Sequence, residues 1–140
     1  MLAIRAVYEG DLRCRVTHGP SGQVFTTDAP ADNFGKGAAC SPTDLVAAAL
    51  GSCILTVMGI VAVRHGINLA GTTVDVRKEM RADPVRRIAS LAAVVSFPRR
   101  FPEDVRALLE RAAGRCPVHH NLHPDIAASV EFRYPALQSA

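Results

Sequence analysis

The sequence lacks tryptophan and contains few aromatic residues, only 5% of its 140 positions. It also lacks a strong charge excess, because 16 Lys and Arg residues against 13 Asp and Glu residues leave a formal net charge of +3. No basic run alternates with aromatic side chains, so we expect no nucleic-acid partner. Repeats and low-complexity tracts are also missing. A chain of this length with 49% hydrophobic residues is expected to form one domain over residues 1–140.

The first residues lack the pattern of a signal peptide. Met1–Glu9 alternates apolar and polar residues as a strand does, and it carries charge early. We therefore expect a cytoplasmic protein. Four cysteines in a reducing compartment are not expected to form a structural disulfide framework. They indicate catalysis, metal binding or simple burial instead.

One long segment, Leu45–Val63, carries no charge and is about long enough to span a bilayer. It is rich in Ala, Gly, Ser and Thr, so it is only mildly hydrophobic on a transfer scale. Strand-like segments flank it on both sides. We interpret it as a core helix that a second subunit helps to cover, with a transmembrane helix as the alternative.

The hydrophobic pattern predicts strands, then a long helix, then more strands and shorter helices. Pro42 and Asp44 suit the first turn of the long helix, and Gly66 ends it. The predicted strands lie near residues 4–7, 12–17, 23–27, 71–80, 88–97 and 127–134. Further helices are expected from Phe101 and after Cys116. The order βββ-α-ββ-α-α-β predicts an α+β fold with antiparallel sheets packed on a central helix.

Two cysteines, 63 positions apart, lie in settings that suit thiol chemistry. Cys53 lies in the apolar helix, where a thiol has a raised pKa and stays inert unless a cation reaches it. Cys116 precedes Pro117 at a helix start, where backbone N–H groups lower a thiol's pKa. If the fold brings them together, they form a redox dithiol. The alternatives are a small buried hydrophobe for Cys53 and a simple cap for Cys116.

A metal site is a further alternative near the second cysteine. Four potential ligands fall within eight residues, namely Cys116, His119, His120 and His123. Such crowding strains tetrahedral geometry, so we expect no metal there. Cys14 and Cys40 have no partner pattern, and we expect them to be packed or exposed rather than catalytic.

Three segments resemble the OsmC/Ohr family, the osmotically inducible and organic-hydroperoxide-resistance proteins. They are Ser41-Pro-Thr-Asp-Leu-Val-Ala-Ala-Ala-Leu-Gly-Ser-Cys53, Arg64-His-Gly-Ile67 and Cys116-Pro-Val118. Asp28-Ala-Pro30 with Gly35-Lys-Gly37 is similar to the OsmC-like branch of that family. The resemblance implies an intertwined homodimer, with two sheets around two central helices. It also implies thiol-dependent reduction of organic hydroperoxides.

The resemblance assigns roles to single residues. It implies that Cys53 is the peroxidatic thiol, that Cys116 resolves it, and that an arginine from the N-terminal strands supports the thiolate. Arg13 is the best match for that arginine, and Arg15 is the rival.

One position departs from the family pattern. The family often has Glu directly after the proline that opens the helix, where it holds the arginine. This chain has Thr43 there, and Asp44 lies one residue later, about 100° further around the helix. We expect an external dithiol reductant and no bound cofactor. The alternative function is a dimeric small-molecule-binding or redox-sensing protein.

Overall fold

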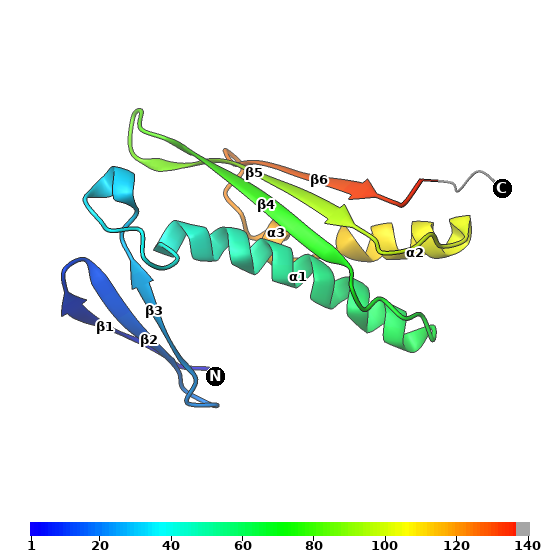
Figure 1. Ribbon diagram of the computed structural model, residues 1–140, viewed down its shortest axis with the longest axis horizontal. Helices are drawn as coiled ribbons and strands as arrows, with labels where there is room; N and C mark the ends of the chain where they lie inside the picture. The colour runs from blue at the N-terminus through cyan, green and yellow to red at the C-terminus, as the bar shows by residue number, and fades with distance from the viewer. Residues whose placement is uncertain (137–140) are drawn as a thin grey trace. The chain divides into compact units, whose positions relative to one another are not determined.

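The computed structural model describes residues 1–136 and has the predicted order of elements (Figure 1). The elements are β1 (Ile4–Gly10), β2 (Arg13–His18), β3 (Val24–Asp28), the 3-10 helix η1 (Ala31–Asn33), α1 (Pro42–Arg64), β4 (Thr73–Arg81), β5 (Arg87–Ser96), α2 (Glu103–Ala113), α3 (Pro117–His120) and β6 (Ala127–Arg133). The chain divides into two compact units, Met1–Val46 and a second that begins at Ala47. The single domain over residues 1–140 stays a prediction.

The first unit contains a three-stranded antiparallel sheet in the order β1-β2-β3. A tight turn sets the β2–β3 register: the His18 N–H donates to the Gln23 carbonyl at 2.8 Å, and the Gly22 N–H donates to the His18 carbonyl at 2.8 Å. Because pairing proceeds one residue at a time from that turn, Arg13 lies directly opposite Asp28.

Helix α1 begins and ends where the sequence predicts, and both ends have recognisable caps. The Ser41 hydroxyl accepts the Asp44 N–H at 3.1 Å, and Oδ2 of Asp44 accepts the Ser41 N–H at 2.9 Å. This reciprocal pair is a capping box. At the other end Gly66 adopts a φ of 64°, and the Ile67 N–H donates to the Ala62 carbonyl at 2.8 Å. These contacts satisfy backbone groups that a helix end leaves without partners.

The second unit contains a three-stranded sheet in the order β4-β5-β6. Strands β4 and β5 form the predicted antiparallel hairpin, but β6 pairs parallel to β5. The expectation of purely antiparallel sheets was therefore wrong for β6. Helices α2 and α3 separate β5 from β6, and such a long crossover returns the chain to the sheet in the same direction.

The core of the second unit lies between its sheet and one side of α1. Leu50, Ile54 and Met58 recur at helical spacing and have no exposed surface. The helix approaches β4 closely at Gly51, where an added Cβ would lie 3.2 Å from Cγ2 of Val76. An added Cβ at position 51 would require the Val76 side chain to shift by a few tenths of an ångström.

The other side of α1 is uncharged and open. Its outward residues are Ala48, Ser52, Thr56, Ile60 and Val63. Among the described residues, α1 is the one helix long and apolar enough to cross a membrane. Length and composition alone do not separate a membrane span from a core helix.

An aromatic cluster holds α2 beside the end of β6. The Tyr134 ring stacks on Phe97 with centroids 4.6 Å apart, and its hydroxyl donates to Glu110 at 2.8 Å. The Arg106 guanidinium lies 5.4 Å from the centroid of the same ring. Burial, and then the Glu110 carboxylate, raise the pKa of Tyr134. The cluster fixes the helix that leads directly to Cys116.

Candidate functional site: a buried thiol pair

Cys116 is positioned by the end of α2 and the start of α3. Its N–H donates to the Ala113 carbonyl at 3.3 Å, and its Sγ accepts the His119 N–H at 3.5 Å. Pro117 occupies the first turn of α3, where its missing N–H costs nothing. The thiol therefore caps α3, as the sequence predicts, and it has no exposed surface.

Cys53 reaches the same place from the middle of α1. It is half-buried, and its side chain lies near enough to Cys116 to raise the pKa of that thiol. Both cysteines are free thiols. Burial is the main cause that raises the pKa of Cys116, and the neighbouring Cys53 side chain raises it further. The His119 N–H acts in the opposite direction but is outweighed.

This arrangement supports disulfide chemistry within one chain. Two neighbouring thiols are candidates for an S–S bond, which needs their Cα atoms within about 7 Å of each other. Cys116 is shielded from solvent, whereas Cys53 is open enough to meet a small molecule. The structure thus brings the two predicted cysteines together, and their catalytic roles stay predictions.

Alkaline pH is expected to destabilise the reduced protein through Cys116. The folded state raises the pKa of this thiol above its ordinary value of 9.0, so above about pH 9 the unfolded chain releases a proton that the folded chain keeps. The contribution of this thiol to stability is therefore fully present below that pH, and it is lost as pH rises through the folded pKa. Urea unfolding from pH 7 to pH 11 under reducing conditions measures the fall.

Cys116→Ala supplies the control for this pH dependence. The variant should show a flatter decline just above pH 9. Tyr134, whose pKa is raised from an ordinary value of 10.0, keeps its own contribution at higher pH. Identical slopes for both proteins up to about pH 10 would contradict the expectation.

The predicted arginines lie in the first unit. Arg13 begins β2 and is exposed, whereas the Arg15 guanidinium lies 3.4 Å from the Glu9 carboxylate. Asp44, which follows Thr43, places its Oδ2 in the helix cap. The assignment of Arg13 to the thiolate stays a prediction.

Cys14, Cys40 and His123 lie outside the thiol pair. Cys14 is half-buried in β2, and Cys40 is exposed. Nδ1 of His123 accepts the Asp125 N–H at 3.0 Å. Within residues 1–136, no three His, Cys, Asp or Glu side chains are grouped to hold a metal ion.

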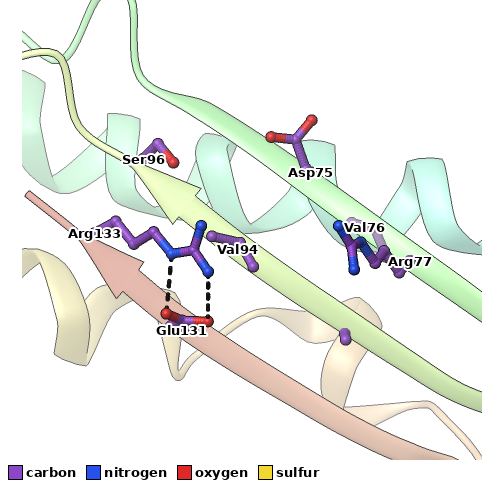
Figure 2. A pocket seen from close by; sticks show the side chains of 8 residues that line it. Asp75, Val76, Arg77, Val94, Ser96, Glu131 and Arg133 are labelled. Atoms are coloured by element: carbon purple, nitrogen blue, oxygen red, sulfur yellow. Dashed lines mark hydrogen bonds and ion pairs between the residues drawn. The ribbon is translucent and has the colours of Figure 1, made fainter.

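A charged groove on the second sheet was not foreseen. Figure 2 shows it along the small side chains of β5, with Asp75 and Arg77 on one side and Glu131 and Arg133 on the other. Its volume is about 590 Å³. Glu131 binds the Arg133 guanidinium through contacts of 3.0 and 3.4 Å, and this raises the pKa of Arg133. No cysteine lines the groove, so it is separate from the thiol site.

A second feature missed from the sequence is the buried carboxylate of Asp28. The sequence contained a clue to its neighbour, since a tight turn after His18 sets the strand register and pairs position 28 with Arg13. Without the structure, the depth of that carboxylate could not be known.

Fold and site together define an α+β protein with two three-stranded sheets and a thiol pair between a long helix and a helix cap. The family model "OsmC-like protein" matches residues 35–131. The chain belongs to this family, as its sequence motifs indicate. A comparison with curated proteins finds no match.

Solved structures agree with this assignment. A candidate osmotic stress induced and detoxification response protein from Psychrobacter arcticus is 41% identical, with 95% of this chain and 96% of that chain covered and a TM-score of 0.89. An organic hydroperoxide resistance protein OsmC from Legionella pneumophila is 17% identical, with 94% and 96% covered and a TM-score of 0.75. The organic hydroperoxide resistance protein OhrB of Bacillus subtilis is 18% identical, with 95% and 98% covered and a TM-score of 0.67. The last two support the fold alone.

Proposed function

We propose that the protein is a thiol-dependent peroxidase that reduces organic hydroperoxides in defence against oxidative stress. The observation that carries this proposal is the closeness of Cys53 to Cys116, whose pKa the Cys53 side chain raises. Membership of the OsmC-like family supports it, since proteins of the same fold are named organic hydroperoxide resistance proteins.

The proposed reaction has three balanced steps. The Cys53 thiolate attacks the terminal peroxide oxygen, the O–O bond breaks, and the leaving alkoxide takes a proton to become an alcohol. The Cys53 sulfenic acid then condenses with the Cys116 thiol, forming the S–S bond and releasing water. An external dithiol returns two electrons through thiol–disulfide exchange and is itself oxidised.

Burial supports Cys53 as the thiol that acts first. A hydroperoxide must reach the attacking sulfur, and only Cys53 has exposed surface. Burial also keeps Cys116 protonated, and a protonated thiol is a poor nucleophile. Cys116 therefore serves as the resolving thiol.

We assign the supporting cation to Arg13. A guanidinium stays charged and can stabilise both the thiolate and the departing oxyanion. Arg15 is the rival on the same strand, and its guanidinium lies 3.4 Å from the Glu9 carboxylate.

The apolar residues around Cys53 in α1 favour an organic hydroperoxide over hydrogen peroxide. Recycling needs a dithiol rather than a resident cofactor. We place the protein in the cytoplasm, where reducing systems would keep the pair reduced.

We further propose that the working form is a homodimer. The open side of α1 exposes Ile60 and Val63 without any charge. One face of the first sheet likewise exposes Ile4, Tyr8 and Phe25. Apolar surface of this kind is characteristic of a covered interface. Sedimentation velocity should give twice the 14.9 kDa chain mass, and a monomer at micromolar concentration would contradict this.

Hydroperoxide consumption with a dithiol reductant tests the peroxidase directly. We expect cumene hydroperoxide to be consumed faster than hydrogen peroxide, and mass spectrometry of the oxidised protein to find a crosslink between positions 53 and 116. Consumption no faster than that of the dithiol alone would refute the proposal.

The groove in Figure 2 supports a second candidate, the binding of a small polar molecule. It offers carboxylates and guanidiniums over a small-residue floor, so its ligand would carry both charges. A protein that serves only this purpose would lack dithiol-dependent turnover.

A further inference from the structure

The carboxylate of Asp28 is buried with one of its two oxygens lacking a hydrogen bond from any described residue. The residue ends β3 and has no exposed surface. Its Oδ2 accepts the Ala38 N–H at 3.0 Å. Its Oδ1 is also buried and accepts no hydrogen bond from residues 1–136. Burying a carboxylate is costly unless a partner compensates its charge. The unbonded Oδ1 therefore points to a missing hydrogen-bond donor.

The loop after β3 fixes this carboxylate in place. Gly35 passes so close to Ala29 that an added Cβ would lie 1.7 Å from the Ala29 oxygen, which only glycine permits. The Gly37 N–H donates to the same oxygen at 3.2 Å. On the strand itself, the Asp28 N–H donates to the Cys40 carbonyl at 3.2 Å. The position of Asp28 is therefore determined by its own unit.

Strand register places Arg13 beside it. The two residues are directly opposite in the β2–β3 pairing. The Ala29 N–H donates to the Leu12 carbonyl at 3.2 Å, just outside this pair. Hydrogen-bonded and non-hydrogen-bonded pairs alternate along an antiparallel ladder, so Arg13 and Asp28 form a non-hydrogen-bonded pair. In such a pair the Cα atoms lie about 4.5 Å apart and both side chains lie on one face. Arg13 is exposed in the structure and does not bond to Oδ1 of Asp28, so the contact requires another rotamer of the Arg13 side chain. A guanidinium can span this distance.

The neighbouring cation is less well placed. Arg15 shares the face of Asp28 but lies two residues further along β2, about 7–8 Å away on the diagonal. It also already pairs with Glu9. Arg13 is therefore the natural partner of the empty oxygen.

We infer that Asp28 is a positioning residue, whose Oδ1 binds the Arg13 guanidinium and aims it. The inference rests on the proposed function, in which Arg13 stabilises the Cys53 thiolate. The carboxylate that the family pattern places after the helix-opening proline is replaced by Thr43 in this chain. Asp28 supplies a carboxylate for the same arginine from the adjacent strand.

A double-mutant cycle tests the contact without any enzyme assay. Asp28→Asn keeps an oxygen for the Ala38 N–H and removes the negative charge. Asp28→Asn, Arg13→Gln and the double variant are compared by thermal unfolding. We expect the two changes to be non-additive by roughly 5 °C in Tm. Asp28→Asn combined with Arg15→Gln or Lys36→Gln should be additive. Additivity with Arg13→Gln overturns the inference, whatever the peroxidase assay shows.

A second readout separates positioning from simple stabilisation. The rate at which iodoacetamide alkylates Cys53 is measured against pH, preferably with Cys14, Cys40 and Cys116 replaced by serine. Asp28→Asn and Arg13→Gln should each shift the profile to higher pH, and the double variant should shift it no further. Peroxidase kcat/KM should fall about tenfold in each. The Tm changes could be non-additive while the alkylation profile of Cys53 stays unshifted in both single variants. That result overturns the positioning role of Asp28 and also the assignment of Arg13.

If Asp28→Asn does not fold, the contact is tested with Asp28 intact. The chemical shift of the Asp28 carboxyl carbon is measured by NMR at pH 7 in the native protein, in Arg13→Gln and in Arg15→Gln. We expect it to change in Arg13→Gln, where the neighbouring guanidinium is removed, and to stay the same in Arg15→Gln. Equal chemical shifts in the native protein and Arg13→Gln overturn the inference.

Discussion

Replacing Cys53 with serine is expected to abolish hydroperoxide turnover, with a loss of at least about 1,000-fold in kcat. A serine hydroxyl is not ionised at neutral pH and cannot displace the peroxide's leaving oxygen as a thiolate does. The measurement is dithiol-dependent consumption of cumene hydroperoxide. If Cys53→Ser consumes it at the native rate, the nucleophile has been misassigned.

Cys116→Ser should behave differently, because the first chemical step does not need that thiol. We expect one equivalent of hydroperoxide to be consumed per chain, followed by a stop or by slow rescue from external thiol. A sulfenic acid trapped at Cys53 by dimedone would be visible by mass spectrometry. Continued rapid turnover would show that Cys116 is not the resolving thiol.

The other two cysteines give matched controls for both variants. Cys14 is half-buried in a strand of the first unit, and Cys40 is exposed beside its loop. Cys14→Ser and Cys40→Ser should each keep the native rate and the crosslink between positions 53 and 116. A large loss in either would mean that the thiol chemistry is shared more widely than we propose.

Ile54→Ala is expected to destabilise the second unit by about 2–5 kcal/mol, with Ile54→Val costing about 0.5–1.5 kcal/mol. The side chain has no exposed surface and lies between Leu50 and Met58 on the buried side of α1. Removing methyl groups leaves a cavity that the surrounding helix and sheet cannot close completely. Equilibrium unfolding in urea measures both variants.

Val85→Ala is the control for this series, because Val85 lies in the turn between β4 and β5 and is 63% exposed. Its effect should stay within about 0.5 kcal/mol. A cost for Ile54→Ala as small as that of Val85→Ala would show that α1 is not the core element that the structure indicates.

The element order and the limits of α1 could be predicted from local sequence. Serine and aspartate three residues apart around a proline form a helix cap through contacts made within one turn. Gly66 ends the helix because the required positive φ is open to glycine. Local chemistry of this kind needs no knowledge of the rest of the chain.

The parallel pairing of β6 could not be predicted in the same way. Alternating residues in 127–134 indicate a strand but not its neighbour or its direction. Only the crossover through α2 and α3 sets both, since it decides from which end the chain re-enters the sheet.

For the candidate site, the sequence by itself determined the chemical types: a cysteine in an apolar helix, a second before a helix-starting proline, and arginines on an N-terminal strand. Tertiary structure decided that the two cysteines are neighbours, which of them is buried, and that Asp28 is enclosed opposite Arg13. The physical reason is that residue type and helix-cap formation depend on the local sequence. Burial and sulfur–sulfur contact depend on segments that meet only when helix and sheet pack together.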